Sequence, residues 1–234
     1  RRISIDGQGF GFGTSRWETC VFLANGQARP TPRGRQAMQL VAEDLACVRG
    51  GRTLFSGLGF SVGAGEALAV TGPNGAGKSS LLRLIAGLLR PVAGRIALEG
   101  GDPERSIGAS AHFVGHLDAA KGALTAAENL EFMRALLGGA GSGGAEALAA
   151  LGLDGLADVP ARMFSAGQRR RLALARLLVA PRPLWLLDEP TTALDAEGQE
   201  TFAALAAKHL AGGGILVAAT HAPLKIAPVT EIRL

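Results

Sequence analysis

Short apolar or β-prone runs recur along the chain, and each has a length typical of a β-strand. They lie at 58–62, 67–71, 95–98, 111–114, 184–187 and 215–220. The run at 184–187 is apolar at every position, as expected for a strand buried on both faces of a parallel sheet. The pattern therefore predicts a sheet whose central strands are fully buried.

Stretches with helical periodicity separate these runs. The pattern predicts helices over 78–88, 125–137, 145–151, 168–179 and from Asp195 to just before Gly212. Thr125 and Glu128 have the spacing of a capping box, and the glycine-rich stretch 138–144 predicts a flexible connection. Because strands alternate with helices, we expect an α/β fold with a mainly parallel sheet. The helical stretch from about 117 to 180 is predicted to be a subdomain inserted between strands.

The first 37 residues differ from the rest of the chain in composition and charge. They are rich in Gly and Arg, and they contain six arginines but only two acidic residues, Asp6 and Glu18. Residues 38–234 contain eighteen basic and eighteen acidic residues. We predict that 1–37 is a disordered arm or a non-native leading segment ahead of one domain at 38–234. A basic arm that touches lipid headgroups is the alternative. Because the pI of 9.7 arises in this segment, we expect no nucleic-acid partner for the main domain.

Nothing in the composition indicates that the chain itself crosses a membrane. No uninterrupted apolar run approaches the roughly 20 residues that span a bilayer. The two cysteines, Cys20 and Cys47, have neither a metal-binding nor a disulfide spacing, which fits a reducing cytoplasmic setting. We therefore expect any membrane role to depend on a partner protein.

A glycine-rich motif after the run at 67–71 carries the strongest functional signal. The sequence Gly72-Pro-Asn-Gly-Ala-Gly-Lys-Ser79 matches the P-loop pattern, and it follows a predicted strand and opens a predicted helix. Its glycines allow the backbone amides to approach phosphate, and the helix start favours an anion. Lys78 adds a charge for the β- and γ-phosphates, and the Ser79 hydroxyl is a ligand for Mg²⁺. The predicted ATP-binding residues here are Gly72, Pro73, Asn74, Gly75, Ala76, Gly77, Lys78, Ser79 and Ser80.

Two acidic residues follow the buried run at 184–187. Asp188 is predicted to hold Mg²⁺, directly or through water, and Glu189 to act as the general base that polarises the attacking water. Together with the P-loop, this pair indicates an ATP hydrolase.

A third motif narrows the class. Phe164-Ser-Ala-Gly-Gln168 lies with its serine 23 residues before Asp188 and opens an arginine-rich helix. It resembles the LSGGQ signature of ABC ATPases, with Ala166 in place of the first glycine. The resemblance implies a P-loop fold of ABC type, with a parallel core, an antiparallel β part and a helical insertion. It also implies a homodimer in which Ser165, Gly167 and Gln168 contact the nucleotide held by the other subunit.

Four further positions take roles through the same resemblance. Asp195 resembles the D-loop aspartate that contacts the partner subunit, and His221 resembles the switch histidine that reaches the γ-phosphate. Two positions depart from the family pattern. His116 stands where the Q-loop glutamine is expected, nine residues before Thr125, and Arg49 stands where an aromatic ring usually stacks on adenine. The Arg49 guanidinium plane is the predicted substitute for that ring.

The wider sequence resembles one branch of the family. Cys47 to Phe55, the phrase GPNGAGKSSLLRLIAGLLRP, Gly115-His116 and SAGQRRRLALARLL are similar to the ATP-binding subunits of cytochrome c biogenesis systems, also called haem exporters. This resemblance implies a membrane-embedded permease partner and a peripheral position on the cytoplasmic face of the inner membrane. ATP hydrolysis would then drive haem export or release of haem from a chaperone. An ABC exporter for another hydrophobic substrate is the alternative.

The remaining polar residues carry weaker expectations. His112 and His116 are four residues apart in a predicted strand, so we do not expect a metal pair. His209 is predicted to lie at the surface. One or two of the three arginines at 169–171 are predicted to be solvated.

Overall fold

A computed structural model describes residues 2–3, 37–139 and 141–234, and the prediction for segment 1–37 therefore lies almost entirely outside the described residues. The strands are β1 (Arg2–Ile3), β2 (Gln39–Arg49), β3 (Arg52–Gly63), β4 (Ala67–Thr71), β5 (Ala93–Glu99), β6 (Ala111–Val114), β7 (Leu184–Asp188), β8 (Ile215–Ala219) and β9 (Val229–Arg233). The α-helices are α1 (Lys78–Ile85), α2 (Ala126–Leu137), α3 (Gly144–Ala149), α4 (Ala166–Val179) and α5 (Ala196–Ala211).

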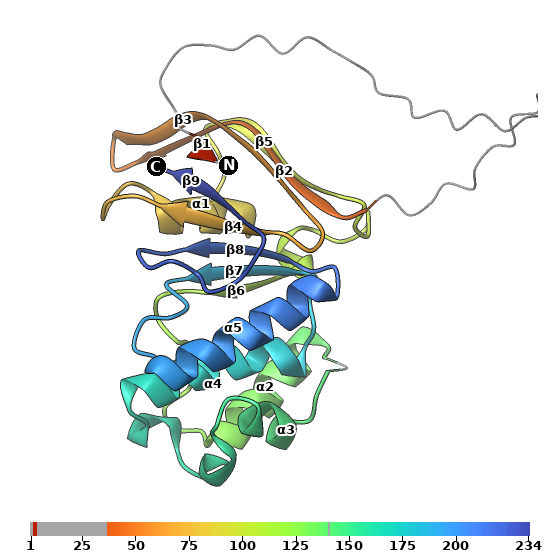
Figure 1. Cartoon of the computed structure of the whole chain (residues 1–234), viewed down its shortest axis with the longest axis vertical. Helices are drawn as coiled ribbons and strands as arrows, with labels where there is room; N and C mark the ends of the chain where they lie inside the picture. Colours follow the sequence, from red (N-terminus) through yellow and green to blue (C-terminus); the bar gives the residue numbers. More distant parts are fainter. Residues whose placement is uncertain (1, 4–36, 140) are drawn as a thin grey trace, which may run out of the picture.

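Two sheets and a group of helices form three layers (Figure 1). The central sheet has the order β1-β9-β4-β8-β7-β6, and all its strand pairs are parallel. A smaller antiparallel sheet has the order β3-β2-β5. The α/β class, the mainly parallel core and the antiparallel part are confirmed. Helices α2, α3 and α4 fall between β6 and β7 in the chain, within the stretch 117–180.

Alternation along the central strands divides the core into two halves. On β7, Leu184 and Leu186 pack with the antiparallel sheet and α1, whereas Trp185 and Leu187 pack with helices α2 to α5. This is the two-sided burial that a fully apolar strand predicts. Helix α1 lies between the two sheets, because its Leu81, Leu82 and Ile85 join the same apolar cluster as residues of both.

Most elements lie where the apolar pattern placed them. Strands β4 and β6 have the predicted bounds, and α2 begins directly after its N-cap Thr125, which forms the predicted capping box with Glu128, and ends at Leu137. Helix α1 ends at Ile85 rather than near residue 88, because the chain turns at Gly87, whose φ is 72°. Strands β2 and β9 were not anticipated.

The structure differs from the sequence expectation at His209 and adds detail at the arginine run. His209 does not lie free at the surface: its ring stacks on Trp185, with 3.8 Å between centroids and 6° between planes. Of the three arginines at 169–171, Arg170 is buried, whereas Arg169 and Arg171 are partly exposed. All three donate hydrogen bonds to protein groups. Arg169 donates to Phe164 O, Arg171 donates to the Asp195 carboxylate, and Arg170 donates to a larger set of acceptors.

One buried histidine gives the fold a pH-dependent stability. His112 on β6 is 3% exposed, and its Nε2 donates to the carbonyl of Ala180. Burial lowers the pKa of His112 from 6.5 to about 4, against the opposing effect of the Ala180 hydrogen bond. The neutral form is therefore the one that the folded chain favours.

We expect the free energy of unfolding to fall as the pH drops from about 6.5 to about 4. In that window the unfolded chain protonates His112 and the folded chain does not, which removes up to about 3 kcal/mol. His112→Gln, whose amide can still donate to Ala180, should make the profile flatter. Urea unfolding of the parent and the variant at about pH 7 and about pH 4.5 measures the difference. Equal pH slopes would contradict the assignment.

No helix in the described part of the chain is long and apolar enough to cross a membrane.

Candidate functional site

The parallel arrangement brings four loops to one edge of the central sheet. Strands β4, β6, β7 and β8 end there, and they are followed by the P-loop, Gly115-His116, Asp188-Glu189 and Thr220-His221. Ligands of open parallel sheets bind outside the carboxyl ends of the strands. The topology therefore gathers motifs that are far apart in the sequence.

The P-loop has a backbone that requires glycine at several positions. Gly72, Gly75 and Gly77 have φ values of 133°, 81° and 109°, a region that other residues rarely adopt. A Cβ at Gly77 would also lie 3.1 Å from the Phe55 ring. These turns aim the loop directly into the start of α1, whose amides then face the cleft.

Lys78 is the first residue of α1 and is only 8% exposed. Its Nζ donates to the carbonyls of Gly72 and Pro73, over 2.8 and 3.1 Å. A buried ammonium group is thus held by the loop that surrounds it. Its position suits a charge that interacts with phosphate.

His221 links Lys78 to the acidic pair. Its Nε2 lies 3.1 Å from Lys78 Nζ and 3.5 Å from Glu189 Oε1. An ammonium group can only donate, so Nε2 is the acceptor and the imidazole carries its proton on Nδ1. The preceding Thr220 fixes the turn, since its hydroxyl accepts from Ala222 N and donates to Ala222 O.

The acidic pair stands at the end of β7. Asp188 ends the strand and is 4% exposed, whereas the Glu189 side chain is 19% exposed. Glu189 has a φ of 50°, an uncommon conformation for a residue with a side chain. Its amide donates to Ala219 O on β8 over 2.8 Å, so the neighbouring strand holds the turn in place.

A cleft of about 700 Å³ combines these groups. The predicted residues that line it are Asn74, Gly75, Gly77, Lys78, Ser79, Ser80, His116, Asp188, Glu189 and His221. Gly72, Pro73 and Ala76 belong to the same loop but do not line the cleft. The sequence missed five more lining residues: Leu54, Thr191, Thr192, Gln199 and Ala222. Thr191 and Thr192 are separated from Glu189 only by Pro190, and this proximity in the sequence was the one available signal.

The oxygen donors in this cleft fit a magnesium ion. Ser79 offers a hydroxyl and Asp188 a carboxylate, both of which are hard oxygen ligands. Within the described residues, no group of three or more His, Cys, Asp or Glu side chains is arranged around a common metal position. One hydroxyl and one carboxylate suit Mg²⁺, which usually keeps water and substrate phosphate among its ligands.

The signature residues form a second cleft of about 360 Å³. It is lined by Gly152, Ser165, Gly167, Gln168, Arg171, Ala193 and Asp195. Ser165 caps α4 in a reciprocal capping box with Gln168. Asp195 caps α5 through Gly198 N, and the Asp195 carboxylate also accepts from Arg171 over 2.6 Å. The Gly198 amide, then Arg171, lower the pKa of Asp195, which keeps it ionised.

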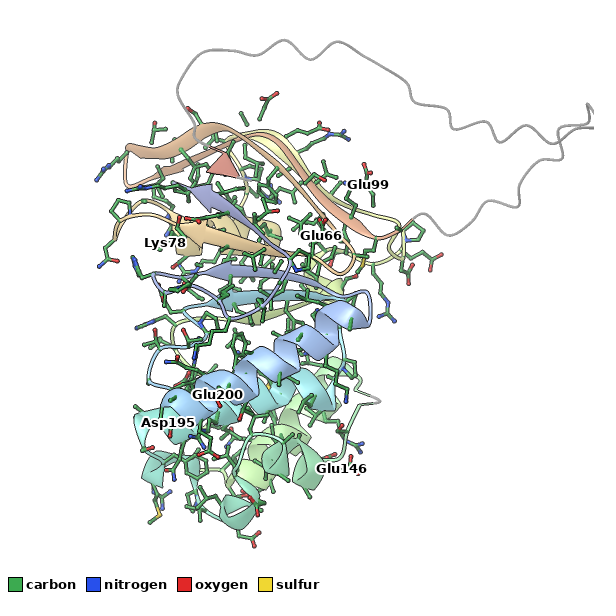
Figure 2. The ribbon with its side chains drawn as sticks, in the orientation of Figure 1. Glu66, Lys78, Glu99, Glu146, Asp195 and Glu200 are labelled. Atoms are coloured by element: carbon green, nitrogen blue, oxygen red, sulfur yellow. The ribbon has the colours of Figure 1, made fainter. Side chains whose placement is uncertain are left out.

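The two clefts lie apart in one chain. In Figure 2, Lys78 and Asp195 lie on the same side of the molecule, with Lys78 near the antiparallel sheet and Asp195 at the start of α5. No residue lines both clefts. The structure thus brings the P-loop, acidic and histidine residues together and leaves the signature residues and Asp195 at a separate place.

Arg49 is the predicted binding residue outside the P-loop that lines neither cleft. It ends β2, opposite Arg52 in the turn to β3, and is exposed. Leu54, further along β3, lines the P-loop cleft instead. The structure therefore offers an apolar side chain, rather than the guanidinium, at the wall of this cleft.

Together, the P-loop cleft and the separate signature cleft define a nucleotide-binding P-loop ATPase of the ABC type. Residues 55–192 match the family model described as ABC transporter. The cytochrome c biogenesis ATP-binding export protein CcmA of Nitrobacter winogradskyi is 60% identical over 197 residues, which are 84% of this chain and 98% of that protein. CcmA of Rhodopseudomonas palustris strain BisB5 is 57% identical, with the same two coverages. The chain belongs to the ABC transporter family, among the CcmA-type ATP-binding proteins, which confirms both resemblances.

Solved structures agree with this fold. An ABC transporter ATP-binding protein from Pyrococcus furiosus superposes with a TM-score of 0.70 at 20% identity, and the match covers 82% of this chain and 96% of that one. An ATP-binding cassette solved as a dimer, in a post-hydrolysis state with ADP and Pi, has a TM-score of 0.66 at 26% identity. That match covers 78% of this chain and 88% of the other.

Proposed function

We propose that this chain hydrolyses ATP as a subunit of an export system for cytochrome c biogenesis. The observation that supports the biological role is the match to CcmA proteins along 94–98% of their length at up to 60% identity. The observation that supports the chemistry is the cleft in which Lys78, Asp188, Glu189 and His221 meet.

In this proposal, the chain's own groups divide the work of hydrolysis. The P-loop amides and Lys78 bind the ATP phosphates. Ser79 and Asp188 hold Mg²⁺, which when bound neutralises phosphate charge. Glu189 accepts the proton of the attacking water. His221 Nε2 accepts from Lys78 and so orients the ammonium group, with Glu189 Oε1 3.5 Å away from the same nitrogen.

We further propose that two copies assemble face to face. Ser165, Gly167, Gln168 and Asp195 line a cleft that is separate from the P-loop cleft of the same chain, so a second copy is needed to bring the two halves together. Ser165 caps a helix of fourteen residues, whose N-terminus favours an anion. The dimeric state of a solved ATP-binding cassette with ADP and Pi supports this arrangement.

The membrane side of the proposal rests on the relatives. CcmA proteins are described as export proteins, and a chain that binds ATP needs a membrane-embedded permease partner to export anything. We place the dimer at the cytoplasmic face of the inner membrane, bound to that permease. Haem export or release of haem from a chaperone is the step that its hydrolysis would drive.

Deletion of the gene in the source cell tests the biological role. We expect the covalently haem-stained bands of c-type cytochromes to disappear from a denaturing gel of membrane proteins. Plasmid-borne parent and Lys208→Ala, a change on the exposed side of α5, should restore the bands, whereas Lys78→Ala should not. Haem-stained bands that persist in the deletion strain would reject the cytochrome c role and leave the ATPase assignment standing.

A further inference from the structure

Arg170 is a buried charged residue outside both clefts. It lies in the second turn of α4, and 3% of its surface is exposed. Its guanidinium contacts five acceptors: the carbonyls of Gly115, Asp188, Glu189 and Pro190, and the carboxylate of Asp118. Burying a charge of this kind is unfavourable unless it is paired and hydrogen-bonded. The five acceptors therefore compensate for the burial of the Arg170 charge.

Three of these acceptors are consecutive residues that include the proposed general base. Arg170 Nη2 donates to Asp188 O over 2.6 Å and to Glu189 O over 2.7 Å, and Nε donates to Pro190 O over 3.3 Å. The chain leaves the sheet here, since β7 ends at Asp188 and the carbonyls of Glu189 and Pro190 lie beyond it. Glu189 also has a φ of 50°, a conformation that persists only where the surroundings enforce it.

The other side of the guanidinium holds the loop after β6. Nη1 donates to Gly115 O over 3.0 Å and to Asp118 Oδ1 over 3.2 Å, and the Asp118 side chain is 21% exposed. These two residues flank His116, which lines the P-loop cleft. One side chain thus joins the signature helix, the loop around His116 and the turn that presents Glu189.

The geometry of this contact needs an arginine. A guanidinium presents five N–H donors in a rigid fork, whereas a lysine ammonium is a point charge and a glutamine amide offers two donors. Neither replacement reaches acceptors on both sides. The adjacent Arg169 and Arg171 contact Phe164 O and Asp195, at the signature and the start of α5. Position 170 is therefore distinct from its neighbours.

We propose that Arg170 is a positioning residue for ATP hydrolysis, which fixes the Glu189 backbone so that its carboxylate faces the attacking water. This inference rests on the proposed ATP hydrolysis. It assigns Arg170 to the chemical step and not to nucleotide binding, since Arg170 does not line the P-loop cleft.

Steady-state ATPase measurements on the full chain test the proposal. We expect Arg170→Gln to lower kcat by about 10- to 100-fold, because a small displacement of a reacting group has effects of this size. KM and the affinity for a fluorescent ATP analogue in EDTA should change by less than about threefold, which corresponds to under ~1 kcal/mol of binding free energy. Arg134→Gln, which removes an exposed arginine paired with Glu131 on α2, is the matched control and should keep the parent rate.

A second comparison separates positioning from a general loss of structure. If Arg170 acts through Glu189, the double variant Arg170→Gln/Glu189→Gln should have the same residual rate as Glu189→Gln alone. Arg170→Lys, which keeps a charge and three donors, should show the same split between kcat and KM with a smaller fall. Size-exclusion chromatography with ATP and Mg²⁺ should show that the double variant Arg170→Gln/Glu189→Gln dimerises as Glu189→Gln does.

Several results would overturn the inference. The positioning role of Arg170 would be excluded by a parent-like kcat in Arg170→Gln or by multiplicative losses of kcat in the double variant. It would also be excluded if the double variant lost the ATP-dependent dimer. A parent chain that hydrolyses no ATP would instead overturn the proposed function itself.

Discussion

Replacing Glu189 with Gln should stop hydrolysis while leaving nucleotide binding intact. We expect kcat to fall by about 10²- to 10⁴-fold, the range typical of removing a general base. The amide has nearly the same shape as the carboxylate, so the left-handed turn at Glu189 and the lining of the cleft should persist. The loss therefore reports on the missing proton acceptor and not on a changed fold.

The same substitution should make the dimer visible. A chain that binds ATP with Mg²⁺ but does not hydrolyse it stays in the ATP-bound state, so Glu189→Gln should elute as a dimer in ATP and as a monomer without nucleotide. Glu200→Gln, an exposed change on α5, is the matched control and should keep the parent rate and show no lasting dimer. A Glu189→Gln chain that stays monomeric in ATP would contradict the face-to-face assembly, and a parent-like rate would contradict the general-base role.

The parts of the fold that the sequence predicted are those with strong local signals. Strand β7 is apolar from Leu184 to Leu187 because both of its faces are buried. The start of α2 is marked in the sequence by the capping-box residues Thr125 and Glu128. Strand β2 was missed, because its bulges break the simple alternation and Asp44 has a φ of 47°. Strand β9 was missed too, since it is short and its residues at 229–231 are only partly buried.

The residues of the candidate site likewise fall into those that local sequence signals predict and those that they do not. Motif spacing placed the P-loop, Asp188, Glu189 and His221, because each follows a strand and parallel strands end at a common edge. Spacing could not place Leu54, which reaches the P-loop cleft from the antiparallel sheet. The choice between Arg49 and Leu54 depends on how the two sheets pack, and no local pattern encodes that packing.

Arg170 shows a second limit of sequence reasoning. In a run of three arginines on a helix, the pattern favours solvated side chains. The structure directs this one inward, because the carbonyls at the end of β7 and the Asp118 carboxylate together satisfy its donors. A buried cation can be recognised only when its acceptors, which come from three separate segments, are seen together.

Replacing Lys78 with Ala should remove nucleotide binding itself, in contrast to Glu189→Gln. The Lys78 ammonium is 8% exposed and is held by the Gly72 and Pro73 carbonyls and by His221. Truncating one partner of a buried charge contact costs about 2–5 kcal/mol, so we expect the Kd for MgATP to rise by roughly 30- to 5,000-fold. Isothermal titration with a slowly hydrolysed ATP analogue measures the change. Lys208→Ala is the matched control and should bind as the parent does.

Combining Lys78→Ala with Glu189→Gln in one chain separates the role of Lys78 in nucleotide binding from a role in hydrolysis. Lys78→Ala should fail to dimerise in ATP, even with Glu189→Gln in the same chain, because assembly depends on bound nucleotide. If the double variant instead dimerises in ATP as Glu189→Gln does, Lys78 is not needed to hold the phosphates. The P-loop amides and the start of α1 would then be sufficient for binding, and the role of Lys78 would be confined to the charge that develops during hydrolysis.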